Sequence, residues 1–189
     1  MLNKDQMEIS IKYSKLENIK ASPTLFFEFH GSEESNKEAI KIVEELSKNN
    51  GGGNFQWAES IEERNKLWKA RHDVYYSVKA LGNNMKVYST DICVPISKLV
   101  ECVSWAEKHV KENGLIAPMV GHVGDGNFHS IILYDPKDEK KQKLIRDYSD
   151  QLIQKALELE GTITGEHGIG LQKKHYLLKQ HPDNLPAMK

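Results

Sequence analysis

The sequence predicts an α+β domain, in which an antiparallel sheet is covered by helices on one face in a ferredoxin-like arrangement. Three observations support this class. Short segments rich in β-branched and aromatic residues alternate along the chain with longer amphipathic segments. Two apolar segments flank the dipeptide Asp125-Gly126, which is typical of an antiparallel hairpin. No linker, repeat or low-complexity tract divides the 189 residues, so a single domain over residues 1–189 is expected.

The helical segments are recognised by their apolar period and by residues that start and stop helices. Ser60 followed by Glu63 is a capping-box sequence, and Pro95 suits the first turn of a helix. Asn49-Asn50-Gly51 and Gly114 are stop signals. Helices are therefore expected over residues 2–16, 35–48, 60–80, 95–113, 137–159 and 171–180.

The strand segments are short and rich in the residue types that favour a pleated surface. The first is bounded by Pro23 and Gly31, and Pro118 lies near the start of another, where a missing N–H group is easiest to tolerate. Strands are expected over residues 25–30, 55–58, 87–94, 116–123, 128–134 and 161–164.

Composition excludes several classes of function. The formal net charge is -1, so no overall field attracts nucleic acid or an acidic membrane surface, and the lysines of 137–143 are interleaved with acids as on a solvated helix face. No apolar run approaches the roughly 18 residues of a membrane span, and the N-terminus has neither a signal core nor an Arg-rich transit pattern. Cys93 and Cys102 fall in apolar stretches and are expected to be buried free thiols in a reducing compartment.

The most informative segment is 121–129, in which two histidines flank the Asp-Gly dipeptide. A two-residue type I′ turn at Asp125-Gly126 would place His122 directly opposite His129. Directly opposed residues share one face, with Cβ atoms roughly 4.5–5.5 Å apart, and two imidazoles in that arrangement can converge on one metal ion. Two ordinary surface or core histidines on a hairpin are the alternative.

A second segment, 164–170, places Glu166 and His167 between glycines, which let the backbone approach a ligand closely. The alternative is an ordinary glycine-rich loop before a helix. Two histidines and one carboxylate form a known open catalytic ligand set. We therefore predict a divalent metal, Zn, Mn or Fe, bound by His122, His129 and Glu166.

No phosphate-binding loop is recognised. Gly51-Gly52-Gly53 follows a helix and precedes a strand, which is the wrong order, and neither GxGxxG after a strand nor a Walker sequence occurs. Taken alone, Arg71 is typical of a solvated helix arginine, and Asp91 is expected to be structural.

The two histidine-containing segments resemble the paired signatures of the FAD-linked oxidase C-terminal domain. Further resemblance lies in residues 22–31, 67–71 and 89–95, so it covers most of the chain. Within this family the sequence is similar to D-2-hydroxy-acid dehydrogenases of the cytochrome-linked D-lactate type. The resemblance implies a cap domain over a flavin. It also implies that His122, His129 and Glu166 ligate the metal, that His167 is the candidate base, that Arg71 meets the substrate carboxylate, and that Asn127 lines the same pocket.

The expected activity is oxidation of a D-2-hydroxy acid such as D-lactate to the 2-oxo acid, with hydride transfer to FAD. Members of the family bind FAD mainly through an N-terminal domain and continue to a C-terminal Asn-Pro-Gly stretch, so the chain is expected to be truncated at both ends. The resemblance also implies an electron acceptor such as cytochrome c and a mitochondrial location, with a cytoplasmic location as the alternative. A metal-dependent hydrolase with the same ligands, although no HExxH occurs, and an inactive fragment are the other hypotheses.

Overall fold

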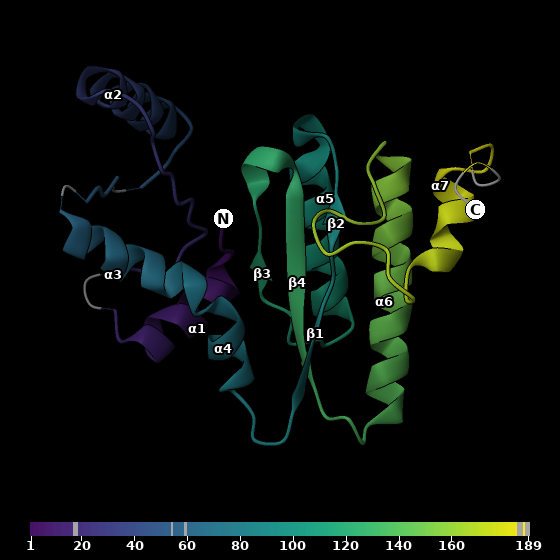
Figure 1. Cartoon of the computed structure of the whole chain (residues 1–189). Coiled ribbons are helices and arrows are strands. Elements are labelled where there is room, and N and C mark those ends of the chain that lie inside the picture. Colours follow the sequence, from purple (N-terminus) through teal and green to yellow (C-terminus); the bar gives the residue numbers. More distant parts are fainter. Residues whose placement is uncertain (17–18, 54, 59, 185–186, 188–189) are drawn as a thin grey trace.

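The computed structural model describes residues 1–16, 19–53, 55–58, 60–184 and 187. At the centre of this part lies a four-stranded antiparallel sheet with β4 (Asn127–Tyr134) as its long strand (Figure 1). β1 (Lys86–Ser89) pairs with β4 through Ser89↔Ile131, and β2 (Ile92–Cys93) continues the same register through Ile92↔Phe128. β3 (Met119–Val120) pairs with β4 through Val120↔His129. The predicted α+β class is confirmed.

Helices cover both faces of the sheet, because β4 is apolar on both sides. Phe128 and Ile132 belong to the larger core cluster, which they share with α5 (Ile96–Glu112) and α6 (Glu139–Glu158). Ile131 and Leu133 point the other way, into a smaller cluster. That cluster also contains Met7 of α1 (Lys4–Ser14) and Val74 and Val78 of α4 (Val74–Lys79). The prediction of helices on one face was therefore wrong.

The N-terminal region is less packed. All residues of α2 (Glu33–Asn49) are described and none of them is buried, and the helix lies apart from the sheet (Figure 1). The predicted strands over residues 25–30 and 55–58 form no ladder within the described residues, and a single Leu2↔Thr24 bridge precedes the first. A strand needs a hydrogen-bonding neighbour, and the described part of the chain offers none along these segments.

Helix boundaries follow the sequence signals with two differences. The predicted helix over 60–80 is divided at Asp73 into α3 (Ile61–His72) and α4, while the Ser60 capping box is confirmed. The predicted final helix is reduced to a 3-10 turn, η2 (Lys174–Tyr176), and α7 (Leu177–Gln180).

The predicted strand over 161–164 contributes only the isolated bridge Cys93↔Thr162. Among the described residues, no helix has the length and apolar character of a membrane span.

The turn of the hairpin differs from the prediction. A 3-10 turn, η1 (Val123–Asp125), precedes Gly126, and Gly126 alone in this turn has a positive φ, at 78°. The connection is therefore longer than a two-residue type I′ turn, and the Asn127 N–H donates to the His122 carbonyl at 3.3 Å. Val120, not His122, lies opposite His129. A side chain at 126 would meet the Val94 carbonyl oxygen at 1.9 Å, so glycine is required there.

Candidate metal and substrate site

His129 is the buried centre of the site. It lies on β4 with 5% of its surface exposed. Its Nδ1 is 2.8 Å from the Thr90 carbonyl oxygen, and its Nε2 is 2.9 Å from Glu166 Oε1. A carbonyl oxygen only accepts, so Nδ1 carries the hydrogen of the neutral ring. The lone pair of Nε2 then faces the Glu166 carboxylate.

The Thr90 carbonyl is free to accept from His129, because the Thr90 hydroxyl takes the place of that carbonyl in the hydrogen bonding of the sheet. The Thr90 N–H donates to the Ser130 carbonyl at 3.1 Å, as in a regular ladder. The Ser130 N–H, however, donates to Thr90 Oγ1 at 2.8 Å instead of to the Thr90 carbonyl. The carbonyl is thereby left to accept from the imidazole, which fixes the orientation of the ring.

The pair formed by His129 Nε2 and Glu166 Oε1 fits a divalent cation. Two lone pairs that face each other at 2.9 Å need a proton or a metal between them. Metal–nitrogen and metal–oxygen bonds of about 2.1 Å that meet at a right angle, as in octahedral coordination, place the two ligand atoms about 3 Å apart. Both the types of donor atom and their separation therefore match two neighbouring ligands of one ion.

His167 lies beside this pair. Its ring stacks on that of His129, with centroids 4.9 Å apart and planes inclined by 8°. Its Nε2 is 3.7 Å from Glu166 Oε1, and about half of each of these two side chains is exposed. The structure thus brings together three of the predicted site residues: His129, Glu166 and His167.

His122 and Arg71 form a neighbouring pair. Arg71 Nη2 donates to His122 Nε2 over 3.2 Å, since a guanidinium only donates. Burial lowers the pKa of Arg71, and the negative charge of Glu166 opposes this shift. Among the described residues, the possible metal-binding group of three is Asp91, His129 and His167, which contains neither His122 nor Glu166. The predicted ligand set of His122, His129 and Glu166 therefore stays a prediction.

Asp91 was assigned only a structural part from the sequence, yet it is the most connected residue of the site. It is 2% exposed and lies between β1 and β2. Burial by itself raises the pKa of this carboxyl, but hydrogen bonds from Thr164 and from the loop backbone outweigh it and hold the pKa well below its usual range. The donors to its carboxylate are Asn127 Nδ2, Thr164 Oγ1, the N–H groups of Gly165, Glu166 and His167, and Lys173 Nζ. An acid within an apolar strand was the signal that could have indicated such a network.

Asn127 is buried, with 4% of its surface exposed. Its Nδ2 donates to Asp91 Oδ1 at 3.0 Å and to the Ile92 carbonyl at 2.8 Å, so both amide hydrogens are in use. Its Oδ1 has no hydrogen-bond partner among the described residues. The predicted contact of Asn127 with substrate stays a prediction, and this oxygen is the atom that could make it.

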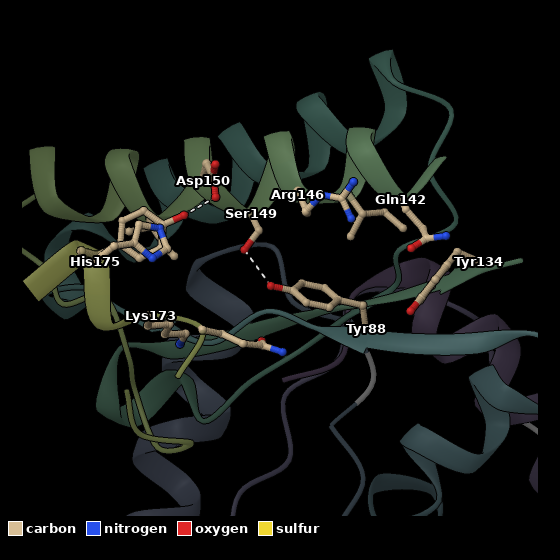
Figure 2. Close-up of a pocket in the computed structure, with 12 residues that line it drawn as sticks. Tyr88, Tyr134, Gln142, Arg146, Ser149, Asp150, Lys173 and His175 are labelled. Atoms are coloured by element: carbon tan, nitrogen blue, oxygen red, sulfur yellow. Dashed lines mark hydrogen bonds between the residues drawn. The ribbon is translucent and has the colours of Figure 1, made fainter. Parts of the chain in front are cut away.

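A separate hollow of about 430 Å³ lies under α6 (Figure 2). None of the predicted site residues lines it. Three of its hydroxyl groups are engaged locally: Tyr88 with Ser149 at 3.0 Å, and Tyr176 with Asp150. Lys173 lines the hollow and also donates to the Asp91 carbonyl at 2.7 Å, so this lysine contacts both the hollow and the site.

The two cysteines differ in exposure. The prediction that both are buried is confirmed for Cys102 and wrong for Cys93, which is partly exposed and whose thiol donates to the Asp125 carbonyl at 3.1 Å. Neither forms a disulfide.

Comparison with known proteins relates the whole chain to one family. The model of the FAD linked oxidases, C-terminal domain, matches residues 1–189. A probable mitochondrial D-lactate dehydrogenase of Danio rerio is 46% identical over 159 residues, which are 84% of this chain and 32% of that protein. A mitochondrial D-lactate dehydrogenase [cytochrome] of Arabidopsis thaliana is 34% identical over 177 residues, which are 93% of this chain and 31% of that protein. The glycolate oxidase subunit GlcD of Bacillus subtilis is 28% identical, covering 89% of this chain and 36% of that protein. The chain spans about a third of the length of these relatives.

Proposed function

This chain belongs to the FAD-linked oxidases, C-terminal domain family, and on that premise we propose that it is the substrate- and metal-binding part of a flavin-dependent D-2-hydroxy-acid dehydrogenase of the D-lactate type. The single observation that carries the proposal is the 2.9 Å approach of His129 Nε2 to Glu166 Oε1, with His167 stacked beside it. The relatives' names support the substrate class, because D-lactate and glycolate are both small 2-hydroxy acids.

The metal would be held by His129 and Glu166, with His122 as the third ligand. The orientation of His129 by the Thr90 carbonyl supports this, because it leaves Nε2 available as a ligand. A divalent ion, Zn, Mn or Fe, would supply Lewis acidity that lowers the pKa of the substrate hydroxyl when bound.

Arg71 would bind the substrate carboxylate through two parallel hydrogen bonds, which the planar guanidinium favours. Its 3.2 Å contact with His122 supports this role, because a carboxylate on Arg71 would lie next to a proposed metal ligand. His167 would accept the hydroxyl proton, a contribution of about 10²–10⁴ in rate. FAD, bound mainly by residues outside this chain, would supply the acceptor for the hydride from C2.

A mitochondrial location and an electron acceptor such as cytochrome c are part of the same proposal. They are supported by the names of the relatives, several of which are mitochondrial D-lactate dehydrogenases of the cytochrome type.

The metal site is tested on the chain alone by calorimetric titration with Mn²⁺ and Zn²⁺. We expect one site in the wild type and loss of binding in His129→Ala, His122→Ala and Glu166→Gln. His30→Ala, which removes an exposed histidine elsewhere, is the matched control and should bind as the wild type does. Undiminished binding by His129→Ala would overturn the ligand assignment.

The activity is tested in a chimera in which this chain replaces the corresponding third of the Danio rerio relative. We expect D-lactate to bleach the flavin absorbance anaerobically, and L-lactate to leave it unchanged. His167→Ala should keep the metal content while slowing bleaching by about 10²–10⁴. A metal-loaded, flavin-containing chimera that no D-2-hydroxy acid bleaches would refute the proposal.

A further inference from the structure

We propose that Asp91 is the positioning residue of this site, and that its carboxylate holds the 164–167 loop so that Glu166 faces His129. The inference rests on the proposed metal-binding role of His129 and Glu166. Asp91 itself would contact neither substrate nor flavin. Together with Thr90, which orients His129, it would make the junction between β1 and β2 the support for both ligands.

The loop is shaped around the Asp91 carboxylate. Three successive backbone N–H groups, of Gly165, Glu166 and His167, donate to it at 3.0, 3.1 and 3.1 Å. The Thr164 hydroxyl adds a fourth hydrogen bond at 2.6 Å. Because consecutive amides converge on one anion, the backbone that carries Glu166 has little freedom to turn.

Gly165 allows this close approach. A Cβ at position 165 would lie 1.9 Å from Asn127 Nδ2 and 2.8 Å from Asp91 Oδ1. The loop backbone therefore packs directly on the side chains of the sheet, at a place where any larger residue would push it away. The buried Asn127 amide in turn fixes Asp91 from the side of β4.

The buried charge is balanced by Lys173. The Asp91 side chain is 1% exposed, and Lys173 Nζ lies 3.3 Å from its Oδ2, with 16% of the lysine side chain exposed. The same Nζ donates to the Asp91 carbonyl at 2.7 Å. A buried carboxylate is stable only when it is paired and hydrogen-bonded, and Lys173 and the loop supply these two kinds of partner.

Asp91 is unsuited to be a metal ligand although it lies near His129 and His167. Each of its carboxylate oxygens already accepts two or more hydrogen bonds. Its effect on a metal would therefore be indirect, through the position of Glu166. Loss of such an outer partner typically weakens metal binding by about 10–100-fold.

The test uses the ¹⁵N-labelled chain and two measurements: amide hydrogen exchange of residues 165–167 and affinity for Mn²⁺. In the wild type we expect the three amides to be protected. In Asp91→Asn we expect their exchange to accelerate and Mn²⁺ affinity to fall, each by about 10–100-fold. The amides of Ile131 and Ile132 in β4 should keep their protection, which separates loosening of the loop from unfolding.

Asp138→Asn is the matched control, because it removes one carboxylate that caps α6 on the surface, and it should change neither measurement. If Asp91→Asn does not fold, Lys173→Met tests the same network and should accelerate the same amides, with rescue by Lys173→Arg. Unprotected amides at 165–167 in the wild type, or a folded Asp91→Asn chain with wild-type Mn²⁺ affinity, would overturn the inference. Absence of Mn²⁺ binding by the wild type would refute the proposed metal site, while amide exchange would still decide the role of Asp91 in the loop.

Discussion

Helices α6 and α2 have similar patterns of apolar residues but different surroundings. α6 buries six residues against the sheet, among them Leu152 and Ile153, whereas α2 buries none. Ile42 and Leu46 on the apolar face of α2 remain more than half exposed. An amphipathic pattern therefore predicts that a helix has a face to bury, but it does not identify the partner.

The same contrast divides the site. His129, Asn127 and Asp91 belong to the packed sheet, where both faces of β4 are covered. Arg71 comes from α3 in the N-terminal region, and it reaches the site through His122. His129 directly, and Glu166 through Asp91, would thus be held by the packed sheet, whereas the proposed substrate clamp would come from a region with a smaller core.

The largest expected effect compares the same substitution in the two regions. Leu152→Ala in α6, where the leucine is fully buried, should lower the free energy of unfolding by about 2–5 kcal/mol. Leu46→Ala in α2, where the leucine is 56% exposed, should change it by no more than about 0.5 kcal/mol. Urea denaturation of both variants measures this difference. Equal losses would show that α2 is packed in solution as tightly as α6, and the comparison would fail.

A second prediction separates the clamp from the metal ligands. Arg71→Lys keeps the charge but loses the planar pair of donors, so kcat/KM of the chimera for D-lactate should fall about 10–100-fold. Mn²⁺ affinity of the chain alone should stay at its wild-type value. A parallel loss of metal affinity would mean that Arg71 supports the ligands as well as the substrate.

A smaller effect is expected at the start of α3, which carries Arg71. The Ser60 hydroxyl accepts from the Glu63 N–H at 3.1 Å, and Ser60→Ala should cost about 1 kcal/mol of helix stability. Ser60→Asp restores a capping oxygen and serves as the control. Amide hydrogen exchange in α3 measures this loss of helix stability. Faster exchange confined to the amides of the sheet would contradict the explanation that Ser60 acts by capping α3.

The smallest effect concerns the packed region alone. Burial raises the pKa of Cys102 from 9.0 to about 11, so its thiol should react with iodoacetamide more slowly at pH 8 than the partly exposed Cys93. Because the folded pKa is the higher one, the stabilisation from the protonated thiol is present below pH of about 9 and is lost as the pH rises toward about 11. Mass spectrometry of alkylated peptides gives the two rates, and equal rates would indicate that the layer of α5 opens readily.

Local signals predicted much of this molecule. Three signals could be recognised in the sequence because each acts within a few residues of the chain. They are the capping box at Ser60, the proline before α5 and the helical spacing of apolar residues along α6. The strand over 87–94 was also predicted, and its register along β4 is continuous although two residues interrupt the ladder. The strand over 25–30 failed as a prediction because a ladder depends on a neighbour that no local pattern specifies.

By itself, the sequence determined the fold class, the family resemblance and the types of donor atom that the site offers, because these depend on residue identity and short spacing. Only the tertiary structure decided that Val120 lies opposite His129, that Arg71 meets His122, and that Asp91 gathers the 164–167 loop. The contacts of Arg71 with His122 and of Asp91 with Gly165 join residues 51 and 74 positions apart. Their geometry is set by the register of β4 and by the need to satisfy buried polar groups, which are properties of the whole packed chain.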